Sequence, residues 1–181
     1  MKIFICSDIH GDLDSMQKVI EKSNEEKAEK IIILGDLLYH GPRNDLPSTY
    51  APKKVIELLN ENKSKILTVR GNCDTEVDQM VLDFPILADY ALIELDGLKI
   101  FATHGHHHNT ETPPPLMTGD ILLHGHTHLL TIESFGDKNT YINPGSIALP
   151  KGGNPRTYMI YENRRFTIKD LDGSVVKELL F

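Results

Sequence analysis

Three short apolar runs, each followed at once by polar residues, restrict the fold of this chain more than any other feature. The runs cover residues 2–6, 31–34 and 66–69, and their length and β-branched side chains indicate buried strands. Between them, residues 13–23 and 53–62 repeat apolar side chains at helical spacing. Strand, helix and strand in this order form a right-handed βαβ unit, so the sequence predicts a sheet that begins with parallel strands.

The second half of the chain has a different pattern, rich in short strands and turns. Asp96-Gly97 separates two apolar or alternating segments, which is typical of a hairpin. The strands expected here cover residues 91–95, 98–103, 120–123, 130–135, 140–142, 157–161, 165–169 and 174–180. We therefore predict an α/β (α+β) fold in which the two halves form two mixed β-sheets, packed as a sandwich and flanked by helices. Since the sequence contains no linker, residues 1–181 are expected to form a single domain.

Side chains that can bind metal ions follow five of the predicted strands. Asp8 and His10 follow the first strand two residues apart, so on an extended chain both point to the same side. The others are Asp36, Asn72, His104, His126 and His128. Ligands of α/β sheets gather at the carboxyl ends of strands, and this mixture of oxygen and nitrogen donors suits a borderline divalent cation. Turn and capping chemistry is the alternative explanation for Asp and Asn at strand ends.

Composition excludes several other classes of protein. The formal net charge of −7, with no long basic run, makes a general nucleic-acid binder an unfavourable interpretation. Cys6 and Cys73 are too few for a disulfide framework, and Cys6 is expected in the core, so we predict a reducing, cytoplasmic location. Neither a signal peptide nor an apolar run of membrane-spanning length is present. Most of the nine histidines fall between His104 and His128, which a metal site would explain.

Seven short stretches make the sequence resemble the calcineurin-like metallophosphoesterase superfamily, and within it the small YfcE-like phosphodiesterases. The resemblance covers residues 1 to about 160. The stretches are Ser7-Asp8-Ile9-His10-Gly11, Gly35-Asp36, Tyr39-His40-Gly41-Pro42-Arg43-Asn44, Gly71-Asn72-Cys73-Asp74, Thr103-His104-Gly105-His106, Gly125-His126-Thr127-His128 and Asn143-Pro144-Gly145-Ser146. The resemblance implies two divalent ions, with manganese as the default and Zn, Fe, Co or Ni as alternatives.

The resemblance also implies how the ligands divide between the two ions. One ion would be held by Asp8, His10, Asp36 and His128, and the other by Asp36, Asn72, His104 and His126. Asp36 would bridge them, and the pair of ions would generate a hydroxide that attacks a phosphodiester in line with its leaving group.

Four further residues are candidates for catalysis and substrate binding. Cys73 stands where many members of the superfamily have a histidine that acts as general acid, and it is expected near the metals without being a ligand. His106 is the other candidate proton donor, with a supporting or surface role as its alternative. His40 and Arg43 are candidate substrate-binding residues, since Arg suits bidentate contact with phosphate, while a salt bridge that shapes their loop would explain them equally well.

The function expected from these features is metal-dependent hydrolysis of small phosphodiesters. A cyclic-nucleotide phosphodiesterase or a nuclease is the enzymatic alternative, and the negative charge counts against the nuclease. A protein-interaction scaffold that retains its metal site is the alternative from another class. An exposed edge strand in the β-rich half would also allow homo-oligomers to form.

Overall fold

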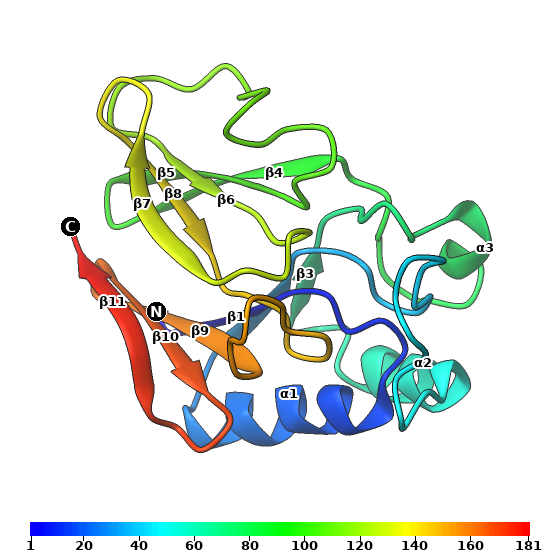
Figure 1. Cartoon of the computed structure of the whole chain (residues 1–181). Coiled ribbons are helices and arrows are strands. Elements are labelled where there is room, and N and C mark those ends of the chain that lie inside the picture. The colour runs from blue at the N-terminus through cyan, green and yellow to red at the C-terminus, as the bar shows by residue number, and fades with distance from the viewer.

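Two β-sheets packed face to face make up most of the molecule, and the computed structural model describes all residues from 1 to 181 (Figure 1). The first sheet has the order β11-β10-β9-β1-β2-β3, and the second has the order β4-β5-β6-β8-β7. Both contain parallel and antiparallel pairs, which confirms the prediction of two mixed sheets. The strands are β1 (Ile3–Cys6), β2 (Lys30–Ile33), β3 (Ile66–Thr68), β4 (Tyr90–Leu95), β5 (Leu98–Thr103), β6 (Ile121–Leu123), β7 (Thr131–Phe135), β8 (Asn139–Asn143), β9 (Thr157–Glu162), β10 (Arg165–Asp170) and β11 (Val175–Leu180).

The predicted βαβαβ unit is present at the start of the fold. Helices α1 (Leu13–Glu25) and α2 (Pro52–Glu61) connect the parallel strands β1, β2 and β3 and lie on one face of the first sheet (Figure 1). The side chain of Asp12 caps α1 by accepting a hydrogen bond from the backbone N–H of Ser15 (3.1 Å). Because the three strands run in the same direction, their carboxyl ends meet at a single edge of the sheet.

Both faces of the first sheet are buried at β1 and β2, which explains why these two strands are almost continuously apolar. In β1, Phe4 and Cys6 face the core beneath the helices, whereas Ile3 and Ile5 face the core between the sheets. The second sheet contributes side chains such as Ile100 and Leu123 to that inner core. The expected burial of Cys6 is confirmed.

One detail of the predicted architecture was wrong. The last three strands do not extend the second sheet; β9 pairs antiparallel with β1, and β10 and β11 follow it outward. The parallel crossovers lead from β1 to β2 and β3, and they leave the other edge of β1 free to pair. The predicted flanking helices lie on the first sheet. Outside the second sheet, Leu116 from the connection between β5 and β6 packs on Phe101, Leu122 and Tyr141.

The structure adds one short helix, α3 (Glu76–Gln79), that was not predicted. It begins with a capping box in which Thr75 and Asp78 bond each other's backbone N–H. No helix has the length and hydropathy to cross a bilayer. Strands β4 and β7 are the edges of the second sheet, and β4 exposes Tyr90 and Leu92, so subunit pairing through this region stays a prediction.

Candidate metal centre

The seven predicted ligands lie together on loops that leave the carboxyl ends of the strands. Asp8 and His10 follow β1, Asp36 follows β2, and the next loop, after β3, carries Asn72. His104 follows β5, while His126 and His128 follow β6. The structure therefore brings side chains from both sheets to one common edge.

The first group of donor atoms comes from Asp8, His10 and His128. Oδ1 of Asp8 lies 3.3 Å from Nε2 of His128 and 3.8 Å from Nε2 of His10. The two imidazole nitrogens are 3.3 Å apart. All three residues are buried, so few water molecules can reach the atoms that converge here.

The second group is built around His104. Its Nε2 lies 3.4 Å from Oδ2 of Asp36, 3.1 Å from Oδ1 of Asn72 and 3.1 Å from Nδ1 of His126. The same oxygen of Asp36 also lies 3.7 Å from Nε2 of His10, which belongs to the first group. Asp36 therefore faces both groups, which is the position that a bridging carboxylate requires.

Hydrogen bonds to backbone carbonyls determine which nitrogen each histidine presents to the centre. The Nδ1 atoms of His10, His104 and His128 lie 2.8, 2.6 and 2.5 Å from the carbonyl oxygens of Tyr39, Leu34 and Leu149. Because a carbonyl only accepts hydrogen bonds, Nδ1 carries the proton and Nε2 of the neutral ring has a lone pair that points inward.

The result is a set of acceptor atoms that lack donors. In the neutral rings, Nε2 of His10 and Nε2 of His128 have lone pairs and no proton to share. Oδ1 of Asp8 is buried without any hydrogen-bond partner. Buried unpaired acceptors are costly, and a cation between them removes that cost, so the residues present fit a divalent metal ion.

The charges of the centre also favour a cation. Burial opposes ionisation of Asp8 and Asp36, but the neighbouring histidines outweigh it and hold both pKa values below the usual range. Burial disfavours the charged form of His104, yet Asp36 and Asp8 raise its pKa to about 9, so a cation that binds at its Nε2 has to displace a proton. Burial lowers the pKa of His10, which keeps that ring neutral and able to coordinate.

Most of the candidate ligands have a left-handed backbone conformation. Five of the seven residues have positive φ angles: Asp8 (60°), His10 (52°), Asp36 (56°), His126 (63°) and His128 (61°). For residues with a Cβ, this conformation costs on the order of 1 kcal/mol or more each. Strain of this kind persists where the surrounding structure enforces it, and it is typical of functional sites.

Sequence reasoning missed Asp74, which holds this backbone in place. Its buried carboxylate accepts the N–H groups of Asp36 (2.9 Å), Leu37 (2.9 Å) and Gly71 (2.7 Å). Gly71 is needed at its position because a Cβ there would lie 2.1 Å from Oδ1 of Asp36. Its position at the end of the Gly71-Asn72-Cys73-Asp74 stretch was the one feature of the sequence that could have identified it.

The turn that contains Asn143 and Ser146 supports the centre from the other side. The buried side chain of Asn143 donates to the carbonyl oxygen of Gly125 (2.9 Å) and to Oγ1 of Thr127 (3.0 Å). Oγ of Ser146 donates to the carbonyl oxygen of Asp8 (3.0 Å). This turn, one of the stretches that carry the family resemblance, braces the loops that carry His126, His128 and Asp8.

Cys73 lies next to the centre, as expected, in a form that is not ionised. Its backbone N–H donates to Oδ1 of Asp36 (2.9 Å). Burial, followed by the charge of Asp36, raises the pKa of its thiol far above the usual value. A thiol in this state is neither a thiolate ligand nor a strong acid.

His106 and His40 take different positions around the centre. The ring of His106 lies 5.4 Å from that of His104 and 6.3 Å from that of His126, and its Nδ1 is buried without a partner. Burial, helped by His104, lowers the pKa of His106 to about 4, so at neutral pH the ring is neutral. His40 instead packs edge-on against Tyr39 and Tyr50, at centroid distances of 4.8 and 5.4 Å.

A polar crevice opens onto the centre and is lined by two basic residues. Arg43, which was predicted, and Lys151, which was missed, share it with Asp36, Asn72, Cys73, His126 and His128. Arg43 is exposed on the wall of this crevice. Burial lowers the pKa of His126, and the charges of His104 and Arg43 add to that effect. The free volume is about 30 Å³, which is on the scale of one or two water molecules.

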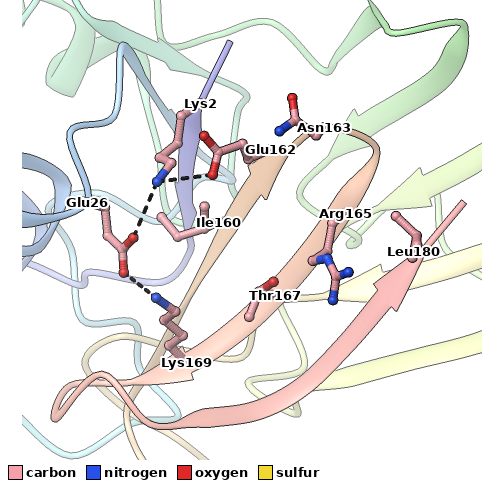
Figure 2. A pocket seen from close by; sticks show the side chains of 9 residues that line it. All are labelled: Lys2, Glu26, Ile160, Glu162, Asn163, Arg165, Thr167, Lys169 and Leu180. Atoms are coloured by element: carbon pink, nitrogen blue, oxygen red, sulfur yellow. Dashed lines mark hydrogen bonds and ion pairs between the residues drawn. The ribbon is translucent and has the colours of Figure 1, made fainter.

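A separate charged hollow of about 340 Å³ lies over β9 and β10, beside the end of α1 (Figure 2). Its charges pair with one another: Glu26 contacts Lys169 (2.6 Å) and Lys2 (3.9 Å), and Lys2 contacts Glu162 (3.1 Å). Because these charged groups already pair with one another, they link β9 and β10 to the end of α1. The hollow therefore has no counterpart to the unpaired acceptor atoms of the metal centre.

Two sheets that deliver carboxylates, an amide and imidazoles to one shared edge define a metal-dependent phosphoesterase architecture. The chain belongs to the calcineurin-like phosphoesterase superfamily, whose family model, described as "Calcineurin-like phosphoesterase superfamily domain", matches residues 1–165. This confirms the resemblance inferred from the short motifs.

Individual relatives agree with this assignment over nearly the whole chain. The chain is 46% identical to phosphodiesterase YfcE of Escherichia coli K12 over 180 residues, covering 99% of this chain and 97% of that protein. It is 34% identical to phosphodiesterase MJ0936 of Methanocaldococcus jannaschii, covering 80% and 83% of the two chains. The solved structure of YfcE, described as a phosphoesterase from E. coli, matches with a TM-score of 0.95 over 99% of this chain and 98% of that chain.

A more distant structural match shows only that the fold recurs. Vacuolar protein sorting 29 from Cryptosporidium parvum matches with a TM-score of 0.64 at 17% identity, over 99% of this chain and 98% of that chain. At this level of identity the likeness extends to the fold and not to the activity.

Proposed function

We propose that this protein is a metal-dependent phosphodiesterase that hydrolyses small phosphodiesters. The observation that carries the proposal is the convergence of carboxylate, amide and imidazole donor atoms on two sides of the Asp36 carboxylate. The names of YfcE and MJ0936 support the substrate class. We further propose that residues 1–181 act as one domain and that a reducing cytoplasm is its location.

We propose that the centre holds two divalent ions, with Mn²⁺ as the first to test. Asp8, His10 and His128 would hold one ion, Asn72, His104 and His126 the other, and Asp36 would bridge them. When bound, two such ions neutralise charge on the phosphoryl oxygens and lower the pKa of a water molecule.

The residues around the crevice orient the substrate. Arg43 can donate two parallel hydrogen bonds to phosphoryl oxygens, and Lys151 adds a second positive charge from the opposite loop. His106, as a neutral imidazole beside His104, can donate an N–H to the leaving oxygen. The backbone N–H of Cys73 donates a hydrogen bond to the Asp36 carboxylate. His40 packs against Tyr39 and Tyr50 and helps to position these two rings.

Hydrolysis of bis-p-nitrophenyl phosphate tests the proposal. Activity should rise with added Mn²⁺, disappear in a chelator and return when the metal is restored. An Asp36→Asn variant should lose activity, while Glu57→Ala, at an exposed position of α2, should retain it. Hydrolysis that persists in a chelator would refute the proposal.

A panel of substrates then separates the enzymatic alternatives. Hydrolysis of a cyclic nucleotide would identify a cyclic-nucleotide phosphodiesterase. Hydrolysis of an oligonucleotide would identify a nuclease, which the net charge of −7 disfavours. A protein that binds metal but hydrolyses no diester would correspond to the scaffold alternative.

A further inference from the structure

An apolar groove of about 360 Å³ adjoins the crevice of the metal centre. Residues from the loop after β2, from α2 and from the segment around α3 form its walls. The apolar members that matter here are Tyr39, Tyr50, Ile56, Val77 and Val81, and Cys73 also belongs to the lining.

Cys73 connects this groove to the metal centre, because it lines both the groove and the crevice. Its sulfur and one ligand atom each from His10 and Asp36 lie within 4.8 Å of one another. A substituent on a phosphorus atom held at the centre is therefore close enough to enter the groove.

The crevice and the groove differ in size, so they suit different parts of a substrate. The crevice has a free volume of about 30 Å³, which accommodates phosphoryl oxygens but not a bulky ester group. The groove has more than ten times that volume, 360 Å³ against 30 Å³. An ester group larger than methyl therefore has to leave the crevice, and the groove is directly adjacent.

The surface of the groove indicates the chemistry of its occupant. Val77 is 70% exposed and Tyr39 is 43% exposed, so both present apolar surface that a ligand could cover. Tyr39 and Tyr50 both pack edge-on against the His40 ring. Lys53 and Asp78 are the only charged side chains in the lining and carry opposite charges, so the groove has no net charge to attract an ionic group.

We propose that this groove is a subsite for an uncharged, flat, apolar ester group of the phosphodiester, such as an aryl ring. The inference rests on the proposed function and narrows its substrate class. Substrates with a second phosphate or a sugar at this position would be poorer, because neither gains from contact with Val77, Val81 and the two tyrosine rings.

Calorimetric titration of the Mn²⁺-loaded protein with phenylphosphonate and with methylphosphonate tests the subsite. Both probes present the same phosphonate to the metals and differ only in their one substituent. Covering about 50 Å² of ring surface at about 25 cal/mol per Å² corresponds to about tenfold tighter binding of phenylphosphonate. In a Val77→Ser, Val81→Ser double variant, this preference should fall at least threefold.

Met80→Ser is the matched control, because Met80 follows α3, is 83% exposed and does not line the groove. The control should keep the wild-type preference. A wild-type preference below threefold, or a preference that falls less than threefold in the double variant, would overturn the inference. Hydrolysis of bis-p-nitrophenyl phosphate is measured in parallel, so a phenyl preference without hydrolysis rejects the proposed function and leaves the subsite standing.

Discussion

Replacement of Asp36 by Asn should remove both metal ions, whereas replacement of His128 by Ala should remove only one. Oδ2 of Asp36 lies 3.7 Å from Nε2 of His10 and 3.4 Å from Nε2 of His104, so one carboxylate serves both groups. His128 contacts only the first group. Asn at position 36 keeps Oδ1 as the acceptor for the N–H of Cys73, so the loop should retain its conformation.

The magnitude follows from the lost charge. Two unit charges about 4 Å apart interact by about 4 kcal/mol at an effective dielectric constant of about 20, so one carboxylate charge contributes about 8 kcal/mol to the binding of a divalent ion. Even half of this contribution corresponds to roughly a thousandfold in the dissociation constant. At a Mn²⁺ concentration of 100 times the wild-type dissociation constant, each bound ion stabilises the protein by about 2.7 kcal/mol. For a chain of this size, that corresponds to a rise in melting temperature of roughly 5–11 °C per ion.

Circular dichroism melting with and without Mn²⁺ measures this shift, since the chain has no Trp for fluorescence. Equilibrium dialysis with metal analysis counts the bound ions. We expect two ions in the wild type, one in His128→Ala and nearly none in Asp36→Asn, with Glu57→Ala as the unaffected control. If both variants lost the same number of ions, or if Mn²⁺ raised the melting temperature of Asp36→Asn as much as that of the wild type, Asp36 would not be shared by the two ions.

Three other substitutions separate substrate binding, site geometry and overall stability. Arg43→Ala should lower kcat/KM for bis-p-nitrophenyl phosphate by about 10- to 100-fold, since charged hydrogen bonds contribute about 1.5–3 kcal/mol; an unchanged kcat/KM would exclude Arg43 from substrate binding. Gly125→Ala should reduce the free energy of unfolding by about 1–3 kcal/mol and impair metal binding, because its Cβ would lie 1.9 Å from Oγ of Ser7; a wild-type denaturation curve would contradict this. Glu26→Gln, which breaks the ion pair with Lys169, should cost about 1 kcal/mol of stability in urea denaturation and leave kcat unchanged; a drop in kcat would connect the charged hollow to catalysis.

Much of the fold could be predicted from the sequence because its signals are local. The apolar runs of β1 and β2 are buried on both faces, and the βαβ rule orders them together with β3. The pairing of β9 with β1 could not be predicted, because an apolar alternation shows that a strand exists and does not show which free edge it joins. The short helix α3 escaped notice since a single capped turn has no periodicity.

The proximity of the seven candidate ligands could also be predicted, because each follows a strand and strand ends converge. Their supporting residues could not. Asp74 resembles an ordinary turn residue until its carboxylate is seen to accept three backbone N–H groups. Lys151, between a proline and two glycines, has no local feature that connects it with Arg43 across the crevice.

The sequence by itself determined which donor atoms are available and which strand end carries each of them, because these properties depend on residue type and on short-range periodicity. Only the tertiary structure decided how those atoms are presented. The carbonyl oxygens of Tyr39, Leu34 and Leu149 belong to loops far along the chain from His10, His104 and His128, and they select the nitrogen that faces the centre. The same long-range packing places Cys73 in the lining of both the polar crevice and the apolar groove. Each of these spaces is formed by several segments that lie far apart in the sequence.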